Sequence, residues 1–155
     1  MSAILSGKSF LFIKAIILSL LLIIVSSCSV KLISSYDEIT DKTVTQLQKD
    51  FETFFITIEC LDKPNCEYEN HKRFYQDAKI TISSLAIRAN AIPKNSLTIK
   101  QIEILKNSLD NLEKLHKLGC LSVDQIKDLR NSFNVIFTAI LKLEIAKKRG
   151  KNNSE

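Results

Sequence analysis

Apolar residues recur at alternating spacings of three and four along most of the chain after residue 36, a pattern typical of helices with one buried face. The pattern predicts four helices, at about residues 37–61, 67–92, 99–118 and 123–149. The positions on the four faces are, in chain order, Val44, Leu47, Phe51, Phe54, Ile58 and Leu61; Tyr68, His71, Tyr75, Ala78, Ile82, Leu85, Ala89 and Ile92; Ile102, Leu105, Leu109, Leu112 and His116; and Ile126, Leu129, Phe133, Ile136, Ile140 and Leu143. We expect these faces to form one core.

Start and stop signals fall near the ends of these segments. Three pairs match a capping box, in which a hydroxyl and a carboxylate or amide satisfy the free backbone N–H groups of the first turn: Ser35 with Glu38, Thr98 with Gln101, and Ser122 with Gln125. Helix-breaking residues follow the first three segments, at Pro64, Pro93 and Gly119. Because short connections between long helices favour antiparallel neighbours, the sequence predicts an all-α, up-down-up-down four-helix bundle.

The N-terminus carries a different pattern. Two lysines, Lys8 and Lys14, precede an apolar run at residues 15–25, and Ser26, Ser27 and Cys28 follow it. The run is shorter than the roughly 20 residues that a membrane-spanning helix needs. The segment resembles a bacterial lipoprotein signal, in which the apolar stretch is removed and the cysteine becomes the lipidated first residue of the mature protein. The resemblance implies that acyl chains on Cys28 anchor the protein to a membrane that it does not span.

This interpretation divides the chain into a signal peptide at 1–27, a lipidated cysteine and tether at 28–36, a bundle at 37–149 and a disordered tail at 150–155. Ser29 stands where an aspartate would signal inner-membrane retention in similar lipoproteins, so we expect the outer membrane, with the protein facing the periplasm. Two alternatives remain. The apolar run stays attached as an uncleaved anchor, or an ordinary signal peptidase removes it and leaves Cys28 free for disulfide pairing.

Composition narrows the classes of function. Removal of residues 1–27 lowers the formal charge from +5 to +3, which is too small to predict nucleic-acid binding. The chain contains no GxGxxG, phosphate-binding loop, HExxH or GxSxG motif. We therefore expect no enzyme activity and no cofactor.

Antiparallel topology also predicts where charged residues gather. An even number of antiparallel helices returns the C-terminus to the end of the bundle where the N-terminus lies. Four basic residues near the C-terminus would then face the lipid surface: Lys147, Lys148, Arg149 and Lys151. Such a cluster attracts anionic headgroups. The simpler interpretation is that these residues complement the dipole of the last helix and keep its end soluble.

The same topology gathers cysteine and histidine at the opposite end. Cys60 and Cys66 lie in the first connection and Cys120 in the third, while His71 and His116 lie near them on the second and third helices. In an oxidising periplasm three cysteines predict one disulfide and one free thiol. Cys60 and Cys66 flank a turn-forming stretch and pair locally, or Cys66 pairs with Cys120 and closes a longer loop.

A metal site is the alternative at this end. Its candidate ligands are Cys60, Cys66, His71, His116 and Cys120. Glu113 and His116 have the Glu-x-x-His spacing of di-iron bundles, which use that motif on two helices, whereas this chain contains it once. The cysteine and histidine spacings match no zinc finger or ribbon. The disulfide is therefore the stronger prediction.

Parts of the mature chain carry a second resemblance. The segments 35–38, 74–75 and 142–150 are similar to a group of small, uncharacterised bacterial envelope lipoproteins that are expected to be helical. This resemblance implies an envelope location and supplies no site. We expect a lipid-anchored, periplasm-facing protein with a structural or protein-binding role, whose partners are membrane lipid and an envelope protein. The alternative is a lipoprotein that binds a small ligand or metal at its cysteine and histidine end.

Overall fold

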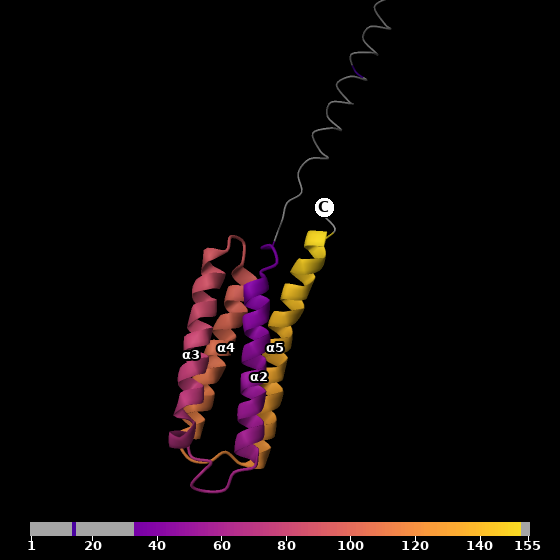
Figure 1. The fold of residues 1–155 in the computed structure, drawn as a ribbon. Helices are drawn as coiled ribbons and strands as arrows, with labels where there is room; N and C mark the ends of the chain where they lie inside the picture. Colours follow the sequence, from indigo (N-terminus) through magenta and orange to yellow (C-terminus); the bar gives the residue numbers. More distant parts are fainter. Residues whose placement is uncertain (1–13, 15–32, 153–155) are drawn as a thin grey trace, which may run out of the picture. The chain divides into compact units, whose positions relative to one another are not determined.

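The structure, a computed structural model, describes Lys14 and residues 33–152, with side chains as far as Gly150. From residue 33 onward it contains α2 (Glu38–Glu59), α3 (Tyr68–Ala91), α4 (Ser96–His116) and α5 (Val123–Asn152). Successive helices run antiparallel, and α2 and α4 each pack against both α3 and α5 (Figure 1). The prediction of an all-α, up-down-up-down four-helix bundle is confirmed.

The bundle has two ends that differ in content. The terminal pole is formed by residues 33–37, the turn at 92–95 and the end of α5, while the cysteine pole is formed by the connections at 60–67 and 117–122 (Figure 1). Within the residues that the structure describes, no helix combines the length and apolar character that a membrane span requires.

The core is built from the predicted faces. Phe51 lies at its centre, with its ring centroid 4.7 Å from that of Phe133 and 5.0 Å from that of Phe74. Two fully buried aromatic residues, Phe55 and Phe137, were missed by the predicted faces because the apolar stripe on α2 and α5 is wider than one residue per turn. Replacing such a buried ring by alanine costs about 3–5 kcal/mol of unfolding free energy.

The start of α2 differs from the prediction. Asp37, and not Ser35, is the N-cap: its carboxylate accepts hydrogen bonds from the backbone N–H and hydroxyl of Thr40, at 3.2 and 2.6 Å. Arg88 of α3 donates two further bonds to the same carboxylate, each at 2.6 Å. A charged cap held by a second helix therefore replaces the predicted local capping box.

The start of α4 also differs. The helix begins at Ser96, two residues before the predicted cap Thr98, which is fully buried inside the first turn. The preceding turn bends at Lys94, whose φ is 58°. Asn95 occupies the N-cap without capping through its side chain, because that amide bonds residues elsewhere in the terminal pole.

At α5 the predicted capping box is present. The Ser122 backbone N–H donates to the Gln125 side-chain oxygen at 2.9 Å, and the Gln125 backbone N–H donates to the Ser122 hydroxyl at 3.2 Å. The helix continues to Asn152, so residues 150–152, predicted as part of a disordered tail, are helical. Residues 153–155, like the predicted signal peptide at 1–27, lie outside the described residues, apart from Lys14.

Candidate functional site

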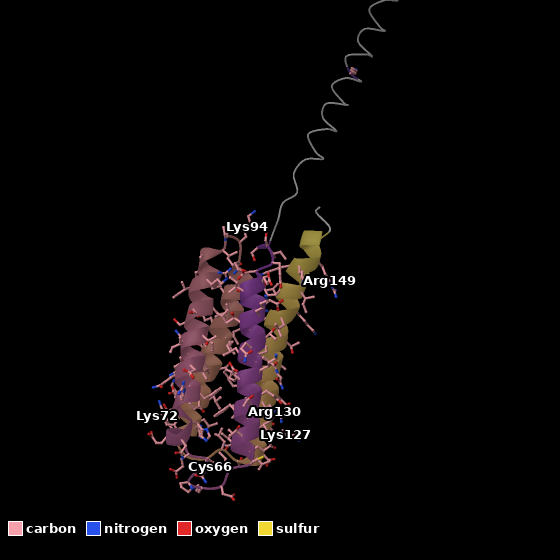
Figure 2. The ribbon with its side chains drawn as sticks, viewed as in Figure 1. Cys66, Lys72, Lys94, Lys127, Arg130 and Arg149 are labelled. Atoms are coloured by element: carbon pink, nitrogen blue, oxygen red, sulfur yellow. A yellow bond between two sulfur atoms is a disulfide. The ribbon has the colours of Figure 1, made fainter. Side chains whose placement is uncertain are left out.

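A disulfide joins the two loops of the cysteine pole. Cys66 pairs with Cys120 across a Cα–Cα distance of 5.3 Å, and Cys60 is an exposed free thiol. Of the two pairings left open by the sequence, the longer one is therefore present, and the local Cys60–Cys66 pair is not. Cys60 lies at the C-cap of α2, whereas Cys66 is buried. Figure 2 shows Cys66 in the connection that precedes α3.

His116 connects this disulfide to the core. Its Nε2 lies 2.8 Å from the Cys66 carbonyl oxygen, which only accepts, so Nε2 carries the proton. Its Nδ1, 2.8 Å from the Tyr75 oxygen, then accepts a hydrogen bond from the Tyr75 hydroxyl. Burial lowers the pKa of His116, and burial also raises the pKa of the Tyr75 hydroxyl. Both groups are therefore neutral at pH 7 and act as structural hydrogen-bonding groups.

The two histidines lie together, as the sequence predicted. The ring centroids of His71 and His116 are 5.8 Å apart. His71, however, makes its own hydrogen-bond contact to the Asn65 backbone oxygen at 3.0 Å, at the surface of the first connection. The proximity of the two rings therefore does not create a shared ligand site, because each ring bonds a different backbone carbonyl.

Glu113 is the centre of an ion-pair cluster beside His116. Its carboxylate accepts hydrogen bonds from the Lys79 ammonium at 2.5 Å and the Tyr68 hydroxyl at 2.8 Å, and the Lys117 ammonium lies 3.1 Å away. Partial burial by itself raises the pKa of Glu113, but the hydrogen bonds from Lys79, Tyr68 and Lys117 outweigh burial and lower it to about 2. The Glu-x-x-His spacing thus serves two separate structural networks. Among the described residues, no group of three or more His, Cys, Asp or Glu side chains is arranged to hold a metal ion.

Two shallow cavities lie near these networks. One, of about 280 Å³, opens at the cysteine pole beside Tyr68, Lys117 and Leu118. The other, of about 300 Å³, lies between α3 and α4 and is lined mainly by apolar atoms, with Lys79, Lys106 and Asp110 among its lining residues. Leu118, which lines the first cavity, is 86% exposed, and Val123 at the start of α5 is 61% exposed. These features suit contact with another surface better than enclosure of a small ligand.

The terminal pole contains a buried ion pair that the sequence analysis missed. The Lys147 ammonium lies 2.6 Å from the Glu144 carboxylate, and it also donates to Asn95 at 2.9 Å and to the Thr98 hydroxyl at 2.7 Å. The side chains of Glu144 and Lys147 are 0% and 3% exposed. A sequence signal exists, because Glu144 and Lys147 lie four and seven residues after Ile140 and so continue its buried stripe.

This network also fixes the segment that precedes α2. The Ser34 backbone N–H donates to the Lys94 carbonyl oxygen at 3.0 Å, and its hydroxyl donates to the Asn95 side-chain oxygen at 2.8 Å. The Asp37 backbone N–H donates to the second Glu144 oxygen at 3.4 Å. Residues before α2, the α3–α4 turn and the end of α5 are therefore joined by one set of polar bonds.

The predicted basic cluster is split by this arrangement. Lys147 does not belong to a surface cluster, because its ammonium is buried in three hydrogen bonds. Lys148 and Arg149 are exposed, and the Lys148 ammonium lies 5.3 Å from the centre of the Tyr36 ring. The side chain of Lys151 lies outside the described part of the chain.

Cys28 lies outside the described residues as well, so the lipid anchor stays a prediction. Comparison of the chain with protein-family models, curated proteins and solved structures finds no match.

Proposed function

We propose that the protein is a lipid-anchored, periplasm-facing lipoprotein of the bacterial envelope with a structural or protein-binding role. The observation that carries the proposal is the sequence Ser26-Ser27-Cys28 directly after the apolar run at residues 15–25. The Cys66–Cys120 disulfide supports an address outside the cytosol, because disulfides persist in oxidising compartments.

The geometry of the bundle supports one orientation of the domain relative to the membrane. Ser34 is bonded into the terminal pole, and it lies six residues after Cys28 in the sequence. Even a fully extended segment of that length reaches only about 20 Å. An anchor at Cys28 therefore keeps the terminal pole near the bilayer and leaves the cysteine pole exposed to the periplasm.

A protein-binding role is supported by the contrast between the buried polar side chains and the exposed apolar ones. The side chains of His116, Glu113 and Glu144 all form hydrogen bonds to neighbouring groups inside the bundle. At this end of the bundle two apolar side chains are exposed to the outside, Leu118 in the cysteine pole and Val123 at the start of α5. Exposed apolar side chains surrounded by polar ones are typical of protein contacts.

The anchor is tested in cells that express the full chain and receive a fatty acid with a clickable alkyne. We expect the label on the wild type and on Cys60→Ala, and its loss in Cys28→Ala. Mass spectrometry of the purified product should then find acyl chains on residue 28 at the N-terminus. An unmodified Cys28, or a leader still joined to it, would overturn the proposal.

The protein-binding role is tested by placing a photo-crosslinking residue at Leu118 in the full chain, with Ser84 on the outer face of α3 as the control position. We expect one reproducible crosslinked species from position 118 and none from position 84.

A ligand-binding role is tested on the purified wild-type protein by metal analysis and a free-thiol count. Stoichiometric metal with three reduced cysteines would defeat the disulfide scaffold and favour the alternative function.

A further inference from the structure

Charge is unevenly distributed between the two ends of the bundle. The terminal pole together with the helix turns next to it, at residues 33–42, 88–103 and 142–152, contains nine Lys and Arg residues and five Asp and Glu residues. Residues 43–87 and 104–141 contain ten basic and eleven acidic residues. The net positive charge of residues 33–152 therefore resides entirely at this end of the bundle, where Figure 2 shows Lys94 and Arg149.

The acidic side chains of the terminal pole are largely occupied by internal partners. Asp37 is held by Arg88, Glu144 by Lys147, and Glu38 lies 2.6 Å from Lys42. Lys100, Lys148 and Arg149 meanwhile remain exposed. The field that the pole presents to its surroundings is therefore positive.

The end of α5 projects beyond the start of α2 (Figure 1). The hydrogen bond between the Asp37 backbone and Glu144 places Glu144 level with the start of α2. Eight further helical residues follow Glu144, which at 1.5 Å per residue extend about 12 Å past that level. Ile145, Lys148 and Arg149 lie on this projection, and Figure 1 shows the end of α5 passing the start of α2.

Apolar side chains are interspersed with these charges. Four large ones are exposed around the pole: Ile33 at 39%, Ile39 at 54%, Leu97 at 53% and Ile145 at 45%. The cysteine pole also exposes apolar residues, but its surroundings lack the positive charge. A mixture of exposed apolar and basic side chains is the composition of surfaces that lie in the headgroup region of a bilayer.

We propose that the terminal pole is itself a membrane-docking surface, which seats Leu97, Ile39 and the projecting end of α5 in the headgroup region of a bilayer containing anionic phospholipid. This inference rests on the proposed anchor at Cys28, whose short connection to Ser34 keeps the pole within reach of the bilayer. It goes beyond the anchor because the folded domain makes its own lipid contacts and adopts one orientation.

The chain contains no tryptophan, so a single introduced tryptophan reports one position. The native lipidated protein carrying Leu97→Trp is reconstituted into vesicles with brominated phospholipid, made from phosphatidylethanolamine and phosphatidylglycerol or from phosphatidylcholine alone. We expect strong quenching in the anionic vesicles and at least about twofold weaker quenching in the neutral ones. The matched control, Leu118→Trp at the cysteine pole, should be unquenched in both.

Charge reversal on α5 completes the test. In the Leu97→Trp background, Arg149→Glu should lower the ratio of docked to undocked protein on the order of tenfold, because a basic contact becomes a repulsive one. Lys127→Glu, on the same helix near the cysteine pole, should leave the ratio unchanged. Quenching at position 97 that is as weak as at position 118, or equal in the two vesicle types, would overturn the docking surface.

Mass spectrometry of residue 28 in the same samples separates the two failures. Acylated protein whose Leu97→Trp is unquenched overturns docking and leaves the anchor intact. Protein without acyl chains on Cys28 overturns the anchor, and with it the docking surface that rests on it.

Discussion

The Glu144 carboxylate and the Lys147 ammonium lie 2.6 Å apart, one turn from each other on α5, and both side chains are buried. Asn95 and Thr98 supply the remaining acceptors for the ammonium. Burying two charges is costly unless they are paired and their other bonds are satisfied. Here both conditions hold, so the pair ties α5 to the α3–α4 turn without leaving an uncompensated charge.

The first prediction concerns removal of one partner. Lys147→Met leaves Glu144 buried with no counter-charge, and we expect it to lower the unfolding free energy by about 3–5 kcal/mol. The double variant Glu144→Leu with Lys147→Met removes both charges and should be less destabilised than the single variant. Chemical unfolding followed by circular dichroism measures both values.

Lys148→Met is the control, because the neighbouring ammonium is exposed and its loss should change stability by less than about 0.5 kcal/mol. If the single and double variants at 144 and 147 lose equal stability, the two residues do not act as a pair, and the network does not hold the terminal pole together.

Periodicity was enough to predict the helices, because burial on one face places an apolar residue at every turn, as at Leu105 and Leu112. The Ser122–Gln125 cap was also predictable, because its two partners are only three residues apart in the sequence. The caps predicted at Ser35 and Thr98 were wrong because partners from other helices determine these positions. Arg88 of α3 donates to the Asp37 carboxylate, and Lys147 of α5 donates to the Thr98 hydroxyl.

The sites were less predictable than the fold. Cysteine spacing left two pairings open, because the choice depends on where the two loops place Cys60 and Cys120 in space. Lys147 was expected at the surface because basic residues near a helix end usually are exposed. Recognising it as buried required combining its place on the stripe of Ile140 with the acceptors that the α3–α4 turn contributes.

The second prediction concerns the disulfide. The two cysteines are separated by 54 in sequence. A cross-link that closes a loop of this length raises the unfolding free energy by about 4 kcal/mol, because it lowers the entropy of the unfolded chain. We expect the double replacement of Cys66 and Cys120 by alanine to lower the unfolding free energy by about that amount. Cys60→Ala should leave it nearly unchanged. Peptide mapping that recovers a Cys60–Cys66 link from the wild type would contradict the pairing.

The third prediction concerns His116 and moderately acidic pH. The ordinary pKa of histidine is 6.5, and burial lowers the pKa of His116 in the folded state. As the pH falls, the unfolded chain therefore takes up a proton on His116 before the folded chain does. The contribution of neutral His116 to the unfolding free energy is present above pH 6.5 and decreases below it, by at most about 1.4 kcal/mol per pH unit. His116→Gln keeps hydrogen-bonding groups without titrating and should flatten this dependence between pH 7 and 5.

The comparison requires the same measurement on His71→Gln, because the rings of His71 and His116 are neighbours. Urea unfolding at several pH values gives the slope for each variant. We expect the slope of His71→Gln to resemble that of the wild type more closely than that of His116→Gln. Equal slopes for the wild type and His116→Gln would show that the buried ring does not carry the pH dependence.

The fourth prediction concerns the capping carboxylate of α2 in stronger acid. Hydrogen bonds from Arg88 lower the pKa of Asp37 from 3.8 to about 2, so its contribution is present above pH 3.8 and is lost as the pH falls toward 2. Asp37→Asn retains a capping side chain but not the charge. It should lower the unfolding free energy at pH 7 by up to about 2 kcal/mol, reduced by solvent screening because Arg88 is 39% exposed.

Unfolding measured from pH 7 to pH 2 should show this difference shrinking as the wild-type carboxylate becomes protonated. Asp62→Asn, in the exposed loop, should differ little from the wild type throughout. A difference for Asp37→Asn that stays constant down to pH 2 would mean that the cap acts through its shape alone, and that the ion pair between α2 and α3 contributes nothing to stability.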